Sequence, residues 1–328
     1  ASGNIYVVDS SSSYIQKFDA SGKFLLQFGT SGNGDGQFNR PYGIAVDASG
    51  NVYVADTYND RIQKFNTSGT YISQFGGSGN GDGQFNRPHG IAVDTSGNIY
   101  VADTDNNRVQ KFDTSGTYVA QFNSGNGEFN NPYSVTVGAS GNIYVADTYN
   151  YRIVQLNSSG TYLSDFGSQG NGGGKFQFLV GVAVDANGNV YATDDSGNTG
   201  VDIQKFDASG NYVKDFTYQA PPEADPHSLC QAFGIARDKN GNVYVANNGR
   251  GTINKYRPSG TLLGTIGTQW DGNGQPLGGE LMQPAGIAVD DAGNVYVADF
   301  YAGLQKFDAS GNFVASVGSF GAYAQTPS

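Results

Sequence analysis

The stretch that decides the fold is residues 40–65, RPYGIAVDASGNVYVADTYNDRIQKF. It contains short apolar runs separated by DASGN and TYND, segments rich in turn-forming Gly, Asn and Asp. The pattern starts at position 38 as FNRPYGIAVD and returns at 85 and 129, with looser copies from 180, 233 and 285. The sequence Gly-Asn-(Ile or Val)-Tyr occurs seven times, with Asn at 4, 51, 98, 142, 189, 242 and 294. The chain is therefore a repeat of one unit.

Each unit predicts four short strands, which in the second copy span residues 43–47, 51–56, 61–65 and 70–76. We call these strands a, b, c and d. Gly50 and Gly69 fall where the tight reversals a–b and c–d need a positive φ. Repeated four-stranded antiparallel sheets predict an all-β fold, a β-propeller. An open solenoid is the less favoured alternative, because nothing resembles a polar terminal cap.

The strand count favours seven blades over six. Seven copies of strands b, c and d but only six of strand a give 27 strands, one short of seven blades. Six blades would leave three strands over. We therefore predict a single propeller domain over residues 1–328, whose first unit lacks its innermost strand. The missing strand would precede residue 1, come from the tail at 319–328, or be supplied by another molecule, and how the ring closes stays open.

The repeated stretch, together with the FGGSGNGDGQF that follows it, resembles the NHL repeat. The resemblance covers essentially the whole chain and implies a propeller of six or seven blades. The family includes extracellular sensor modules, protein and RNA interaction domains, and a few lyases. Fold therefore leaves function open.

Composition limits the classes of partner and the cellular compartment that we expect for this protein. The net charge is −11 with only 18 Lys and Arg, and there is no basic run, which argues against nucleic acid. The richest apolar run, residues 178–184, is far shorter than the roughly 18 residues of a membrane helix, so we expect no membrane insertion. The Ala start, the scarcity of Lys and the sequons at Asn66 and Asn157 predict an exported protein, extracellular or at the cell surface, with its signal peptide already removed.

The loops divide into a uniform set and a variable set. The a–b and c–d turns hardly change between copies, whereas the b–c and d–a loops differ and should lie together on the opposite face. Two d–a loops, 217–232 and 268–285, are long, and the second holds the only tryptophan, Trp270. The residue before each strand a should ring the mouth of a central channel. Aromatic residues there suit sugar rings, prolines or aromatic side chains of a partner, although the rings could equally plug the funnel.

We predict a ligand-binding rim on this variable face. Its first candidates are Tyr42, His89, Tyr133, Phe233 and Trp270, and its second candidates are Tyr58, Tyr149 and Arg250.

Metal sites are weakly supported, and no cofactor is predicted, with calcium or zinc as the alternative. The resemblance implies that NHL-like amidating lyases hold zinc with histidines from several blades. Only His89 could correspond here, and two histidines cannot build a three-imidazole site. Glu223, Asp225, His227 and Cys230 could gather a metal, but a solvated loop is favoured.

Two other recurring features have structural explanations. The GNGDGQF loops at 32–38 and 79–85 lack the following helix of a phosphate site and the carboxylates of a calcium site, so we expect flexible connections. The Asp that ends strand b in six of seven copies predicts turn stabilisation, helped by Arg61, Arg108 and Arg152.

Three hypotheses of function follow. The leading one is a non-enzymatic, exported propeller that binds a protein or glycan through its variable loop face. The second is a metal-dependent lyase acting on a small ligand at the channel mouth, with His89 as base. The third is a structural subunit of a surface assembly, formed by self-association through the missing strand or the C-terminal tail.

Overall fold

The computed structural model describes residues 4–19, 24–125, 127–194, 203–215, 232–238, 240–247, 250–258, 261–270, 277–290, 292–299 and 302–317. The chain divides into two compact units, one of residues 1–19 and 24–215 and one of residues 20–23 and 216–328. Each unit is described by itself below.

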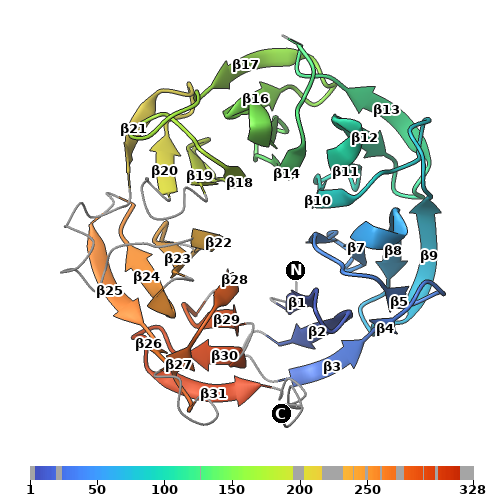
Figure 1. The fold of residues 1–328 in the computed structure, drawn as a ribbon. Helices are drawn as coiled ribbons and strands as arrows, with labels where there is room; N and C mark the ends of the chain where they lie inside the picture. The colour runs from blue at the N-terminus through green and yellow to red at the C-terminus, as the bar shows by residue number, and fades with distance from the viewer. Residues whose placement is uncertain are drawn as a thin grey trace, which may run out of the picture. The chain divides into compact units, whose positions relative to one another are not determined.

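The first unit contains five antiparallel sheets, blades 1 to 5, drawn from blue to yellow in Figure 1. Their strands are β1 (Ile5–Asp9), β2 (Tyr14–Phe18) and β3 (Phe24–Phe28); β6 (Ile44–Val46), β7 (Val52–Asp56), β8 (Arg61–Phe65) and β9 (Tyr71–Gly76); β10 (Pro88–Val93), β11 (Ile99–Asp103), β12 (Arg108–Phe112) and β13 (Tyr118–Phe122); β14 (Pro132–Val137), β15 (Ile143–Asp147), β16 (Arg152–Leu156) and β17 (Tyr162–Phe166); and β18 (Leu179–Val184), β19 (Val190–Asp194), β20 (Ile203–Phe206) and β21 (Tyr212–Asp215). A short parallel pair, β4 (Thr30–Ser31) and β5 (Gln37–Phe38), joins blades 1 and 2.

The second unit contains blades 6 and 7. Their strands are β22 (Ala232–Arg237), β23 (Val243–Asn247), β24 (Thr252–Tyr256) and β25 (Leu262–Ile266), and β28 (Pro284–Val289), β29 (Val295–Asp299), β30 (Gly303–Phe307) and β31 (Phe313–Val317). Between the blades, β26 (Thr268–Gln269) pairs in parallel with β27 (Glu280–Leu281).

The predicted all-β fold is confirmed: the chain is a seven-bladed β-propeller of four-stranded antiparallel blades, and blade 1 has the three strands β1, β2 and β3. Strand bounds in blade 2 agree with the sequence prediction to within one residue at each end. The tail, whose role in closing the ring stays open, lies outside the described residues. Among those residues no helix is long and apolar enough to cross a membrane.

The turns form where the sequence repeats Asp, Gly and Asn. The Oδ1 of Asp47 accepts hydrogen bonds from the amides of Ser49 and Asn51 at 2.9 and 2.8 Å. Gly50 has a φ of +85°, in the left-handed region that favours glycine. Where the turn opens with this Asp, the local side-chain bonding stabilises the a–b reversal independently of the rest of the fold.

The hydrophobic core lies between neighbouring blades. All five residues of β7 and β11 are buried, whereas β9 alternates between half-buried and exposed residues. In the layer between blades 2 and 3, Tyr53 and Ile62 pack with Phe85 and Ile99. In β10, the first strand of blade 3, only Pro88 and Ile91 are buried and the other four residues are half-buried, since β10 is at the edge of its sheet.

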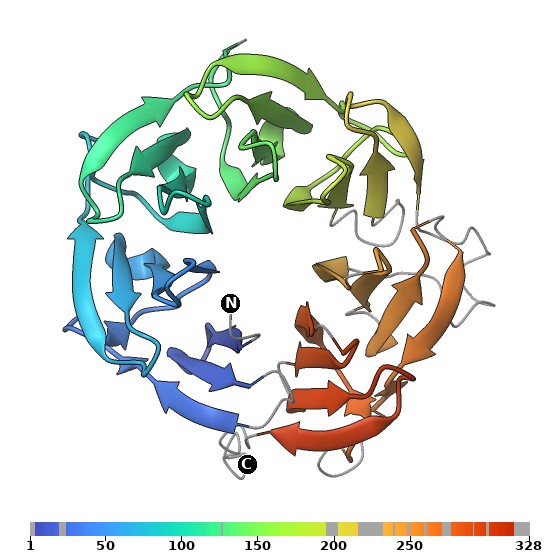
Figure 2. The ribbon, with the colours of Figure 1, turned by 180° about the vertical axis from the view of Figure 1, so that it is seen from behind.

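The first strands of successive blades meet within the first unit. Strands β6, β10, β14 and β18 contact one another in that order, and Figure 1 shows β10, β14 and β18 following one another. Figure 2, from behind, shows the same succession of blades by colour, from blue through green to yellow. Residues at the start of these strands are therefore brought together from positions about one repeat apart.

Candidate functional site

A row of aromatic rings runs along the start of these first strands. The ring centroids of Tyr42 and His89 are 4.7 Å apart and stacked, and those of His89 and Tyr133 are also 4.7 Å apart. Tyr133 meets Phe178 edge-on at 5.7 Å, and Phe178 meets Tyr149 edge-on at 5.6 Å. These are favourable separations for aromatic pairs. We call these five residues, together with Tyr58, the aromatic arc.

The arc is open to solvent at its outer residues. Tyr42, Tyr58 and Tyr149 are 45, 40 and 43% exposed, whereas His89, Tyr133 and Phe178 are half-buried. Grouped exposed rings are unusual on a soluble surface, where contiguous apolar patches mark interaction sites. The structure thus brings together five predicted rim residues, one from each of five sequence segments.

One end of the arc is cationic. The guanidinium groups of Arg40 and Arg87 lie 5.5 and 5.0 Å from the centroid of the Tyr58 ring. The Nε of Arg87 is also 3.6 Å from Oδ2 of Asp105, a surface ion pair. Guanidinium groups over a tyrosine face are attracted by the ring quadrupole, so both arginines stabilise the position of the Tyr58 ring.

Buried threonines fix the backbone that carries the arc. The Oγ1 of Thr57 in blade 2 donates to the carbonyl of Pro88, beside His89, at 2.7 Å. Thr104 donates in the same way to the carbonyl of Pro132, beside Tyr133, at 2.8 Å. Blades 2 and 3 therefore each position the ring of the next blade. The recurring Asp-Thr after strand b carried this signal, and the sequence analysis missed it.

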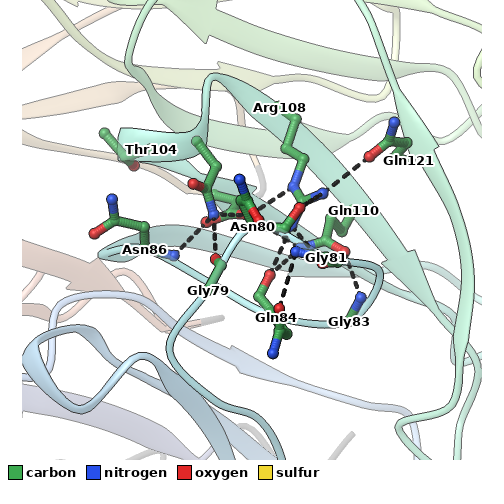
Figure 3. Close-up of polar contacts among 12 residues, drawn as sticks. Gly79, Asn80, Gly81, Gly83, Gln84, Asn86, Thr104, Arg108, Gln110 and Gln121 are labelled. Atoms are coloured by element: carbon green, nitrogen blue, oxygen red, sulfur yellow. Dashed lines mark hydrogen bonds and ion pairs between the residues drawn. The ribbon is translucent and has the colours of Figure 1, made fainter.

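A buried ion pair between Asp103 and Arg108 holds the loop of residues 79–86, which precedes His89 in the chain (Figure 3). The Oδ2 of Asp103 accepts from Nε of Arg108 at 2.7 Å, and its Oδ1 accepts from the amide of Asn86 at 2.8 Å. The Nη2 of Arg108 donates to the carbonyls of Gly81 and Gln84, both at 2.8 Å. Asp103, the Asp that ends strand b, therefore stabilises the neighbouring loop with the help of Arg108, as predicted. The GNGDGQF loop, expected to be flexible, is instead tied down because the guanidinium takes its carbonyls.

In blades 2, 3 and 4 the residue two positions before the arc residue of strand a has a left-handed backbone conformation. Arg40, Arg87 and Asn131 have φ values of 46, 50 and 48°. The amide of Arg87 donates to Oδ1 of Asp60, and that of Asn131 donates to Oδ1 of Asn107, both at 2.8 Å. Non-glycine residues in this region cost roughly 1 kcal/mol or more and persist where their surroundings hold them, commonly at functional sites.

Burial and charge set the protonation of the arc. Burial, together with the smaller effect of the nearby positive charge of Arg87, lowers the pKa of His89 to about 4. Burial raises the pKa of Tyr133, as do Tyr149 and Asp105 nearby. At neutral pH His89 is therefore uncharged, and Tyr133 keeps its phenolic proton.

The remaining predicted residues belong to the second unit or lie outside the described residues. Trp270 is half-buried, and its amide donates to the carbonyl of Leu281 at 2.9 Å, which extends the β26–β27 pair. Arg250 is half-buried before β24, and Phe233 lies in β22, with its side chain outside the described part.

The candidate metal ligands Glu223, Asp225, His227 and Cys230 are also outside the described residues. Within those that are described, no group of three His, Cys, Asp or Glu side chains is placed to hold a metal.

Phe178 is an arc residue that the sequence analysis missed. The copies FNRPY, FNRPH and FNNPY become FQFLV in blade 5, so Val180 replaces the ring while Phe178 appears two residues earlier. Its ring continues the arc to Tyr149. The signal in the sequence was an aromatic residue, Phe178, two positions before the repeat position at which Val180 replaces Tyr or His.

Four segments, residues 38–65, 85–112, 129–156 and 281–303, match the NHL repeat family. The chain contains NHL repeats. Comparison of this NHL-repeat propeller with curated proteins gives no match.

Solved structures similar to the NHL-repeat propeller share its fold at low sequence identity. A streptogramin B lyase has a TM-score of 0.70 at 17% identity, over 93% of this chain and 89% of its own. A catalytically inactive variant of virginiamycin B lyase from Staphylococcus aureus with quinupristin has a TM-score of 0.69 at 15% identity, over 92 and 90% of the two chains. Hydrazine synthase from Kuenenia stuttgartiensis has a TM-score of 0.69 at 12% identity, over 94 and 93%. These likenesses concern the fold alone.

Proposed function

We propose that this NHL-repeat propeller is a non-enzymatic, exported protein that binds a protein or glycan ligand across the aromatic arc. The observation that carries the proposal is the continuous row from Tyr42 through His89, Tyr133 and Phe178 to Tyr149, with its outer tyrosines exposed. Aromatic faces take up the apolar faces of sugar rings and the side chains of proline and aromatic residues.

The rigidity of the arc supports a binding role. The carbonyls beside His89 and Tyr133 are held by the buried hydroxyls of Thr57 and Thr104. A ligand would therefore meet rings that are already ordered, which lowers the entropic cost of binding. The arginines at the Tyr58 end would add a preference for acidic or hydroxyl groups at that end of the ligand.

The protonation of His89 favours binding over lyase chemistry. A general base works best when its pKa lies near the working pH. The pKa of His89 is about 4, since burial and Arg87 both oppose its charged form. Such an imidazole is a weak base at neutral pH, and a ring that packs between two tyrosines serves recognition better than proton transfer.

The test uses glycan and peptide arrays, followed by affinity measurements on the best ligand. Tyr42→Ala should weaken binding at least tenfold, because it removes an exposed ring of the arc. Tyr212→Ala is the matched control, since Tyr212 is 41% exposed on β21 and takes no part in the arc. Equal affinity of the two variants, or no retained ligand on either array, would contradict the proposal.

Two further measurements separate the other hypotheses. Elemental analysis and light scattering on the same chromatographic peak report metal and assembly state. Stoichiometric metal with a turnover that His89→Gln abolishes would replace the binding proposal by a lyase. A large metal-free oligomer would replace it by a structural assembly.

A further inference from the structure

The a–b turn of blade 4 lacks an acidic residue that the other described a–b turns have. In blades 2, 3, 5, 6 and 7 an Asp opens this turn, and its Oδ2 accepts a hydrogen bond from the hydroxyl of the strand-b tyrosine at 3.0–3.3 Å. These aspartates are Asp47, Asp94, Asp185, Asp238 and Asp290. In blade 4 this position is Gly138, so the carboxylate that accepts from the strand-b tyrosine in the other blades is missing beside Tyr144.

Blade 4 also lacks the lysine that covers this tyrosine elsewhere. In the six other blades a strand-c lysine places its Nζ 5.0–5.4 Å from the centroid of the tyrosine ring. These are Lys17, Lys64, Lys111, Lys205, Lys255 and Lys306. In blade 4 the cross-strand partner of Tyr144 is Gln155.

The lysine ammonium also reaches the following blade. The Nζ of Lys64 donates to the carbonyl of Thr114 at 3.0 Å, and that of Lys111 donates to the carbonyl of Ser158 at 3.3 Å. Both carbonyls belong to the second residue of the next c–d turn, which in blade 5 is Ala208. In blades 2 and 3 the lysine ammonium thus contacts a tyrosine ring face and a carbonyl of the next c–d turn. Between blades 4 and 5 the equivalent tyrosine and turn residue are present, but the lysine is not.

A cavity lies at this position. It has a volume of about 230 Å³, and its lining includes Gly138, Asn142, Tyr144, Gln155 and Ala208. The Gln155 amide is hydrogen-bonded within its own blade: its Nε2 donates to the hydroxyl of Tyr144 at 3.1 Å, and its Oε1 accepts from Ser164 at 3.0 Å. A cavity of roughly 150 Å³ is enough to bind benzene, so this one admits a small ligand.

We propose that this cavity binds a primary ammonium group, from a small amine or from a lysine side chain of a partner, in the place that the chain's own lysine takes in the other blades. The Tyr144 ring supplies the aromatic face and Ala208 the carbonyl, and the net charge of −11 attracts cations. The site lies at the a–b and c–d turns, at the opposite ends of the strands from the aromatic arc, and does not depend on what the arc binds.

The experiment is an NMR titration of the isotope-labelled full chain with n-butylammonium chloride, with n-butanol as the neutral control of similar shape. We expect saturable shifts of the backbone amides of Asn142 and Asn187, and no matching shifts with n-butanol. Gln155→Lys restores the residue found in six blades, so it should fold and should weaken the binding of n-butylammonium at least tenfold. Equal effects of the amine and the alcohol, or unchanged binding in Gln155→Lys, would overturn the proposal.

A second pair of ligands distinguishes the two sources of the ammonium group. A peptide with a central lysine is compared with the same peptide carrying acetyl-lysine, which has no charge. Binding of the lysine peptide at least tenfold tighter than n-butylammonium, lost on acetylation, would assign the site to a partner's lysine. Binding no tighter than n-butylammonium would assign it to a small amine, and equal binding of both peptides would overturn the requirement for an ammonium group.

Discussion

Lowering the pH should weaken the fold through His89. The ordinary pKa of 6.5 falls to about 4 in the folded protein, because the ring is packed between Tyr42 and Tyr133 and lies near Arg87. A folded pKa below the unfolded one means that the unfolded chain binds its proton first as the pH falls. The stability present above pH 6.5 is therefore lost between about 6.5 and about 4, and no further loss from this group follows below that.

The size of the loss follows from the shift. At about 1.4 kcal/mol per pKa unit, the change from 6.5 to about 4 corresponds to at most about 3 kcal/mol. His89 is half-buried, so screening by solvent reduces this upper limit. The assay is urea unfolding at several pH values, on wild type and on His89→Tyr. The substitution follows the tyrosines of the neighbouring copies, and the difference between the two curves removes the carboxylates that titrate in both proteins.

NMR measures the pKa directly. The chain has two histidines, so two imidazole signals are expected, and His227→Gln assigns them. We expect a pKa near 4 for His89 and a higher value in Arg87→Gln, which removes the neighbouring charge. A measured pKa at or above 6.5, or the same pH dependence of stability in wild type and His89→Tyr, would refute the packed, partly desolvated ring.

Three further substitutions test how neighbouring blades hold one another, each by the free energy of unfolding in urea. Arg108→Met should cost about 3–5 kcal/mol, since it leaves the buried Asp103 carboxylate without its ion pair, and a loss under 1 kcal/mol would show that the pair is not desolvated. Thr104→Val should cost about 1–3 kcal/mol by leaving a buried carbonyl unsatisfied, whereas an unchanged midpoint would mean that water replaces the hydroxyl. Gly160→Ala should destabilise by more than about 1 kcal/mol, because φ is +83° and a Cβ would lie 2.1 Å from the Phe122 ring; a stabilised variant would contradict that geometry.

The blade strands could be predicted closely because their signals are local. Alternating apolar residues and Asp, Asn and Gly at fixed offsets define each strand and turn within a few residues of chain. The expected strand at 61–65 is β8 as predicted. The short parallel pairs β4–β5 and β26–β27 were not predicted, since each pairs residues across a loop with no periodic pattern.

The candidate site was predictable only in part. Tyr42, His89 and Tyr133 share one position of the repeat, so their alignment in the sequence already placed them on one rim. The link from Phe178 to Tyr149 breaks the repeat register and appears only when the rings are placed in space. The hydrogen bond from Thr57 to the next blade joins residues 31 positions apart, so no local sequence pattern predicts it.

The sequence by itself determined the repeat, the strands and turns, and the variable loop face, because each depends on neighbours along the chain. Only the tertiary structure decided which rings touch, that the pKa of His89 is low, and that the change to Gly138 and Gln155 leaves a cavity beside Tyr144. The physical reason is that the blades meet through side chains about one repeat apart. Packing and desolvation at these contacts between blades depend on distances in space, which the periodicity of the sequence does not specify.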